Sequence, residues 1–245
     1  MTRTLRASLA GAAAMLSLAF MTGTASAVTI TVNSTTPSWT FTGGTSTNTS
    51  TSGSGNATVT DIHWGTSTGS GQSGLGFNPA QPPSFNATAG LLFDLGTLFH
   101  YNNPITGNTP TSITLSLLTN IAGAIPANQA FAFGFTVDET PNSGPVGACP
   151  YPSTVACSDK ITFTNLDTTN AFTLGGQSYT MQLVGFSNDG GATTTNSFIS
   201  NESATNSVHL YAEFIAPHAA PEPATLAVLG VGLLGLASVK RARKV

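Results

Sequence analysis

The chain has 245 residues, of which only 7% are charged, and its formal net charge is −3 at neutral pH. Six of its seven lysines and arginines lie near the two ends, so residues 28–220 hold one lysine, Lys160, against nine carboxylates, a net charge of −8. A surface without clustered cations does not neutralise a phosphate backbone, which argues against a nucleic acid as partner.

The N-terminus has the three parts of a secretory signal peptide. Two arginines within the first six residues precede an apolar stretch over 9–21, and Ala25 and Ala27 form an A-x-A cleavage site. We expect a signal peptide over 1–27, recognised by the export machinery and removed by signal peptidase. The chain before the C-terminal tail then keeps about 190 residues, enough for one hydrophobic core.

The middle of the chain reads as short strands, because apolar residues alternate there with hydroxyl-bearing or small ones. We expect about nine or ten strands and no amphipathic helix. The expected strands lie at 28–42 (an edge strand and its partner), 57–64, 91–99, 112–119, 131–137, 161–163, 172–174, 179–184, 196–199 and 208–214. The pattern predicts one all-β sandwich, jelly-roll or Ig-like, over 28–216.

Turn and loop residues separate these strands. Glycine-rich stretches at 43–55 and 65–76 are expected to be loops, and the prolines at 79–83 argue against a central strand there. Gly175-Gly176 predicts a hairpin turn. The strand over 131–137 should be central, since its phenylalanines share one face and small residues share the other.

Two cysteines, Cys149 and Cys157, enclose a proline-rich loop. In an exported chain we expect them to form a disulfide that contributes about 2–3 kcal/mol. A metal site at this loop is the alternative, but it needs more ligands than two thiols, and no histidine lies nearby in the sequence.

The segment His100-Tyr101-Asn102 is the most distinctive candidate binding site in the sequence. His100 and Asn102 are two residues apart, so they share a face on extended backbone, and Asn103-Pro104 predicts a turn after them. We expect the two side chains to hydrogen-bond the turn backbone, with a binding role for all three residues as the alternative.

No motif assigns catalytic residues, a cofactor or a metal site. The acidic stretches 138–139 and 188–191 could offer oxygen ligands to Ca²⁺, but neither has EF-hand spacing. The histidines do not lie in a nucleophile-elbow or metal-ligand motif.

The C-terminal tail has three parts in a fixed order, after a short spacer over 217–220. The sequence Pro221-Glu222-Pro223 precedes an uncharged apolar run over 224–239. As a helix this run is about 24 Å long, short for a membrane core of about 30 Å. A basic cluster follows and favours a cytoplasmic C-terminus. The cluster consists of Lys240, Arg241, Arg243 and Lys244.

Residues 221–245 resemble the PEP-CTERM sorting signal of Gram-negative bacteria, in which Pro-Glu-Pro, a short apolar helix and a basic end follow one another. The resemblance implies an exosortase as partner, which recognises Pro-Glu-Pro and removes the helix. The protein would then pass through the inner membrane to the cell surface or the extracellular matrix.

The region 58–215 also resembles the THxN family of PEP-CTERM ectodomains, which is similar to the choice-of-anchor K domain. The matching residues are Trp64, Gly65, Gly96, His100, Asn102, Pro104 and Ile105. Phe99 stands where the family has threonine, so the name-giving motif is broken at its first position. The resemblance implies a surface β-sandwich without a characterised activity.

Together these features predict a non-enzymatic surface or matrix protein associated with exopolysaccharide or biofilm. Two alternatives stay open. One is a secreted carbohydrate-active hydrolase, and the other is a surface protein whose tail remains a permanent membrane anchor.

Overall fold

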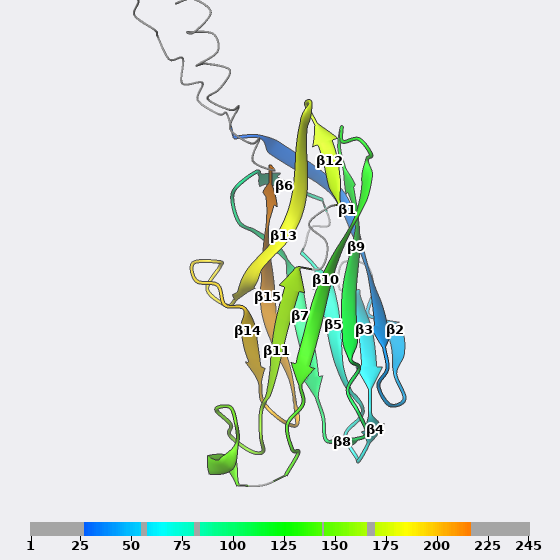
Figure 1. The fold of residues 1–245 in the computed structure, drawn as a ribbon, viewed down its shortest axis with the longest axis vertical. Helices are drawn as coiled ribbons and strands as arrows, with labels where there is room; N and C mark the ends of the chain where they lie inside the picture. The colour runs from blue at the N-terminus through cyan, green and yellow to red at the C-terminus, as the bar shows by residue number, and fades with distance from the viewer. Residues whose placement is uncertain (1–26, 55–57, 81–83, 144, 166–169, 217–245) are drawn as a thin grey trace, which may run out of the picture.

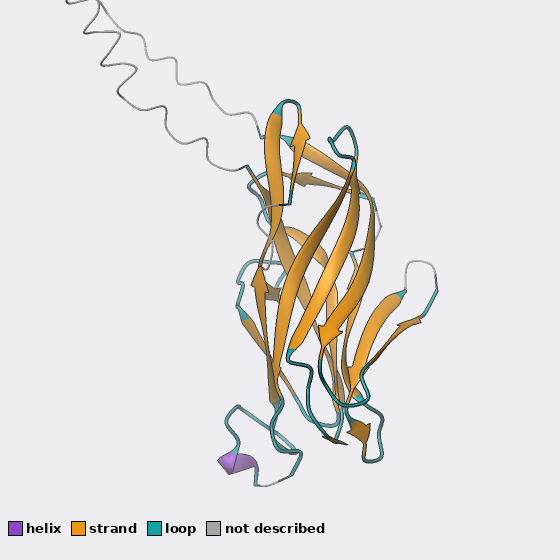
Figure 2. Cartoon of the chain, turned by 45° about the vertical axis from the view of Figure 1, so that its right-hand side comes forward, coloured by secondary structure: helices purple, strands orange, loops and turns teal. Residues whose placement is uncertain are grey.

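The computed structural model describes residues 27–54, 58–80, 84–143, 145–165 and 170–216. Two curled antiparallel sheets face each other and enclose the core (Figure 1; Figure 2 shows the same molecule turned by 45°). The predicted all-β sandwich is therefore confirmed.

The first sheet has six strands. In spatial order they are β14 (Ser197–Ser200), β11 (Asp159–Asn165), β10 (Asn128–Asp138), β9 (Ser112–Ile121), β1 (Thr29–Thr42) and β6 (Phe85–Thr88). The second sheet has seven, and a small pair of strands lies beside it. The seven are β12 (Ala171–Leu174), β13 (Gln177–Ser187), β15 (Ala204–Ile215), β7 (Phe93–Asn102), β5 (Ser73–Pro79), β3 (Val59–Trp64) and β2 (Asn48–Ser52), and the pair is β4 (Thr66–Ser67) with β8 (Ile105–Thr106).

The alternation read from the sequence decides which face of each strand is buried. On β9 the residues Ile113, Leu115, Leu117 and Ile121 are buried on one face, whereas Leu118 on the other face is exposed. On β10 Phe131, Phe133 and Phe135 are buried, and β10 lies between β9 and β11, so the prediction of a central strand is confirmed. The opposite sheet contributes Phe214, whose ring packs edge-on against Phe172.

The first strand differs from the prediction of an edge strand with a separate partner. Residues Thr29–Thr42 form one strand, β1, with an irregularity between Val32 and Ser34. Its start pairs with β6 and its length pairs with β9, so it has neighbours on both sides. The bulge lets one long strand follow the curl of the sheet.

The glycine-rich stretches were also assigned wrongly as loops. β2 lies within 43–55. The end of 65–76 belongs to β5, an inner strand between β3 and β7 whose last residue is Pro79. Glycine is needed on β5 because neighbours approach closely. A Cβ on Gly76 would stand 2.5 Å from Asp61 Oδ1 and 2.8 Å from the Tyr101 hydroxyl oxygen.

Other turns lie where the sequence placed them. Gly175 and Gly176 have φ of 59° and 83° and connect β12 to β13. Within the described ranges, no helix is long and apolar enough to cross a membrane. The expected signal peptide, spacer and sorting tail (1–26 and 217–245) lie outside the described residues.

Candidate functional site: a buried acidic cluster between the sheets

A cluster of ionisable side chains lies where the two sheets meet, at the end of the sandwich that carries the disulfide loop (lower end in Figure 1). His100 comes from β7 of the seven-stranded sheet. Glu139 directly follows β10, and Asp159 begins β11, both in the six-stranded sheet. Ligand atoms of these three residues all lie within 4.8 Å of one another.

His100 is fully buried and is oriented by the last residue of β14, Ser200. Its Nδ1 lies 2.7 Å from the Ser200 hydroxyl, which also accepts a hydrogen bond from Asn206 Nδ2 at 2.8 Å. The other ring nitrogen, Nε2, is buried and has no hydrogen-bond partner. The Trp64 ring stacks near the imidazole, with centroids 6.3 Å apart.

The expectation that His100 and Asn102 hydrogen-bond the turn backbone is corrected by the structure, in which both residues lie in β7. His100 and Asn102 are buried on one face, as their spacing predicted, but they contact another segment instead of their own turn. Asn102 Nδ2 donates to the Ser200 carbonyl at 3.0 Å. Tyr101 faces the other way and donates to Asp61 Oδ1 at 2.7 Å. The three residues therefore do not form one exposed binding turn.

Glu139 connects the cluster to the surface. Its Oε2 accepts a long hydrogen bond from Trp64 Nε1 at 3.4 Å, and Oε1 lies 3.5 Å from the Ser73 hydroxyl. It also lines a surface cleft of about 520 Å³, together with Thr140 and Asn142. The cluster is thus accessible from solvent through the Glu139 side.

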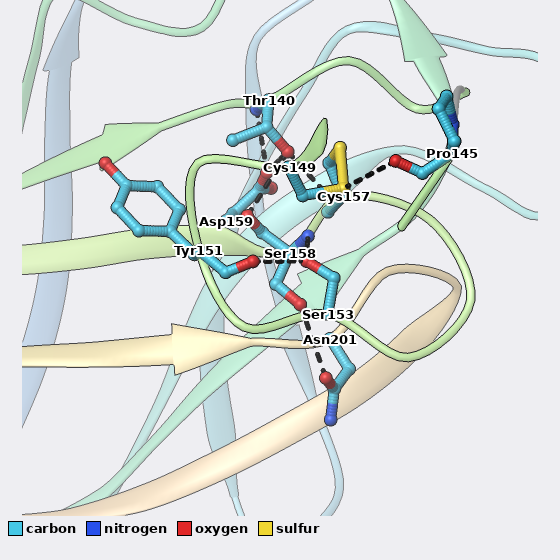
Figure 3. Close-up of a disulfide and its surroundings, with 9 residues drawn as sticks. All are labelled: Thr140, Pro145, Cys149, Tyr151, Ser153, Cys157, Ser158, Asp159 and Asn201. Atoms are coloured by element: carbon cyan, nitrogen blue, oxygen red, sulfur yellow. Dashed lines mark hydrogen bonds between the residues drawn. A yellow bond between two sulfur atoms is a disulfide. The ribbon is translucent and has the colours of Figure 1, made fainter. Parts of the chain in front are cut away.

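Asp159 is held by Thr140, which also contacts the end of the disulfide loop (Figure 3). Its Oδ1 accepts hydrogen bonds from the Thr140 backbone N–H at 2.8 Å and from the Thr140 hydroxyl at 3.1 Å. The same hydroxyl lies 2.9 Å from the Cys157 carbonyl oxygen. Asp159 Oδ2 is buried without a partner. The predicted Cys149–Cys157 disulfide is present and closes the loop just before Asp159.

A third carboxyl group, that of Glu202, lies in the turn between β14 and β15. Glu202 is 3% exposed, and apart from a weak interaction with the Ser203 backbone neither carboxyl oxygen has a hydrogen-bond partner. The charge of Glu202 raises the pKa of Glu139, and the charge of Asp159 raises the pKa of Glu202. Lys160, the only lysine or arginine in the described ranges, lies over the Tyr151 ring instead, 5.1 Å from its centroid.

Burial without a compensating cation changes the protonation of the cluster. Desolvation, with the neighbouring Asp159 charge, raises the pKa of Glu139 to about 8. Desolvation also raises the pKa of Asp159 to about 6 and that of Glu202 to about 7. Burial lowers the pKa of His100 to about 3, so the imidazole is neutral. Between about pH 5 and pH 7 the carboxyl groups of Glu139 and Glu202 therefore hold protons that carboxyl groups in water have already released.

The acidic residues that the sequence offers as possible Ca²⁺ ligands lie in different surroundings in the structure. Glu139 joins the cluster, whereas Asp138 accepts a hydrogen bond from the Tyr151 hydroxyl outside it. In the 188–191 turn, Asp189 is engaged by Ser187 and by Thr193. These hydrogen bonds lower the pKa of Asp189 to about 2. They also hold the turn in its conformation, so no bound ion is needed to account for it.

Comparison with known proteins identifies the tail. The family model of the PEP-CTERM protein-sorting motif matches residues 219–244. No curated protein matches the chain significantly. The match spans the predicted spacer end, the Pro-Glu-Pro sequence, the apolar run and the basic cluster. The chain thus carries a PEP-CTERM protein-sorting motif, which marks it as an exported cell-surface protein that an exosortase sorts.

Proposed function

We propose that this protein is a non-enzymatic component of the cell surface or extracellular matrix that associates with exopolysaccharide. The PEP-CTERM motif at 219–244 carries the proposal, because it directs the chain out of the cell. In this proposal signal peptidase removes 1–27, and an exosortase removes the apolar helix after recognising Pro221-Glu222-Pro223.

The surface of the sandwich supports weak contacts with hydrated polymers. Every residue of β2 is exposed, and all five are Asn, Thr or Ser. A cleft between β1 and β2 is lined largely by hydroxyl groups, including those of Ser38, Thr49 and Ser50. Hydroxyl and amide groups exchange hydrogen bonds with sugars and water, and the negative charge of the domain keeps copies apart.

We also propose that the ectodomain belongs with the THxN group. The two segments that carry the resemblance pack against each other in the fold. Gly65 lies so close to Ile105 that a Cβ would stand 2.4 Å from its side chain, and Trp64 stacks on His100. Four of the residues matched in the sequence, Trp64, Gly65, His100 and Ile105, thus make packing contacts with one another at one end of the sandwich.

The association is tested by fractionating cells that produce the full chain. We expect the protein to copurify with extracellular polysaccharide and to be released when that polymer is degraded by added glycosidases. Retention with the membrane after degradation would contradict the proposal and support a permanent anchor. Release of reducing sugars by the purified protein would contradict it in favour of the hydrolase alternative.

A further inference from the structure

We propose that His100, Glu139 and Asp159 bind a divalent transition-metal ion, with Glu202 as an additional outer carboxylate. The ion would bridge the two sheets, because His100 belongs to the seven-stranded sheet and the two acids to the six-stranded one. The proposal concerns a structural site and is independent of what the surface of the protein binds.

The unpartnered atoms carry the argument. His100 Nε2, Asp159 Oδ2 and both carboxyl oxygens of Glu202 are buried, and apart from the weak interaction of Glu202 with the Ser203 backbone none has a hydrogen-bond partner. His100, Asp159 and Glu202 are 0%, 0% and 3% exposed. Buried polar atoms without a partner are unfavourable and rare in folded proteins, so these unpartnered atoms indicate a missing ligand.

The His100 nitrogen indicates a cation in particular. A ring nitrogen of His100 lies within 4.8 Å of a carboxyl oxygen of Glu139 and of one of Asp159. Nδ1 is hydrogen-bonded to Ser200, so the buried Nε2, which has no hydrogen-bond partner, is the ring atom left to coordinate an ion. In the tautomer in which Nδ1 carries the proton, Nε2 offers a lone pair, and a positive ion would bind that lone pair together with the two carboxylates.

The surrounding hydrogen bonds resemble the outer shell of a metal site. Metal-binding histidines usually hold their second ring nitrogen in a hydrogen bond, and binding carboxylates usually keep one oxygen bonded. Here Ser200 fixes His100, and Thr140 fixes Asp159 through Oδ1. In each case the other atom is left free to bind.

The donor set selects the class of ion. Ca²⁺ and Mg²⁺ prefer oxygen ligands alone, whereas imidazole with carboxylates suits Zn²⁺ and related first-row ions. Ligand atoms around a tetrahedral zinc ion stand about 3.4 Å apart. The ligand atoms of the cluster lie within 4.8 Å of one another, so they need to approach by at most about 1.4 Å. Glu139, at the surface cleft, supplies the route of access and the most movable ligand.

The test uses the full chain purified in detergent, stripped with EDTA and dialysed. Calorimetric titration with Zn²⁺ should give one site per chain, and saturating Zn²⁺ should raise the thermal midpoint, while Ca²⁺ at the same concentration should not. Loss of a ligand in Glu139→Gln or Asp159→Asn should weaken Zn²⁺ binding at least about 100-fold.

Two variants distinguish Zn²⁺ binding at this cluster from unfolding and from Zn²⁺ binding at surface side chains. Glu139→Gln keeps the size of a partly exposed side chain and should leave the fold intact, so lost binding there is not lost folding. His209 lies on the surface, 2.8 Å from Asp94, and provides a control histidine–aspartate pair. His209→Gln should bind Zn²⁺ like the unmodified chain. Absence of Zn²⁺ binding to the unmodified chain, or equal binding by Glu139→Gln, would overturn the proposal.

Discussion

The substitution Glu139→Gln should stabilise the metal-free protein, and by an amount that grows with pH. Glu139 lies beside Asp159 and Glu202, and no lysine or arginine of the described residues balances its charge. Its pKa is raised from 4.5 to about 8. Between these two values the folded state holds a proton that the unfolded state has released. Folding stability therefore falls as pH rises through this window, and glutamine removes that loss.

The other groups of the cluster determine where the effect is measured. The pKa of His100 is lowered from 6.5 to about 3, so below pH 6.5 it is the unfolded state that binds the extra proton, and stability rises with pH. Above pH 6.5 this opposing effect has ended. Asp159, Glu202 and the nearby Asp138 remain in both proteins, so their contributions largely cancel in the comparison.

The magnitude follows from the titration of one group. Between pH 6.5 and 8.5 a carboxyl with a folded-state pKa near 8 loses about 2 kcal/mol of stabilisation. Glu139 is partly exposed, and solvent screening reduces this value, so we expect about 1–2 kcal/mol. The free energy of unfolding is measured by urea titration at both pH values with EDTA present. A stability difference between variant and unmodified protein that stays constant or shrinks with pH would refute the electrostatic reasoning.

Two further substitutions test the loop and the core, both by the same urea titration. Replacing Cys149 and Cys157 by serine opens a loop with a sequence separation of 8 residues and should lower the free energy of unfolding by about 2–3 kcal/mol; a loss below about 0.5 kcal/mol would show that the Thr140–Asp159 hydrogen bonds suffice to hold the loop. Phe133→Ala, at a fully buried position of β10, should cost about 3–5 kcal/mol, whereas Leu118→Ala at a 50% exposed position of β9 should change stability by less than about 0.5 kcal/mol; similar losses at both positions would contradict the assignment of the buried face.

Strands with a regular apolar alternation could be predicted from the sequence. The residues 112–119, 131–137 and 208–214 show the alternation clearly, and β9, β10 and β15 include them. Burial of one face is a local property of such a strand, because successive side chains point to opposite sides. The fold class and the central position of β10 followed from this pattern.

Strands without that alternation could not be predicted. β2 has no apolar residue, and it is a strand because its backbone pairs with β3 at the edge of the sheet. β5 contains Gly74 and Gly76, which composition assigns to loops. Their role is steric, since the carbonyl of Ile62 lies 2.4 Å from where a Cβ of Gly74 would stand. Only the neighbouring strands reveal this need for glycine.

The acidic cluster was accessible to sequence reasoning only in fragments. The sequence indicates His100 as a candidate site residue and Glu139 as a possible oxygen ligand of Ca²⁺, but no motif marks Asp159 or Glu202. The four residues lie in separate parts of the chain, and each stands in or beside a different strand. Only the order of strands in the two sheets brings them to one end of the sandwich. The sequence feature that points to the cluster is the position of these carboxylates at the ends of strands, in a chain with few charged residues.

The sorting of the chain is tested most directly by mass spectrometry of the protein recovered from the cell surface. The expected product begins at Val28 and ends at or near Pro221-Glu222-Pro223, without the apolar run 224–239. In cells that lack the exosortase, the expected product retains the tail and stays with the membrane. Surface protein that still ends at Val245 would contradict the account.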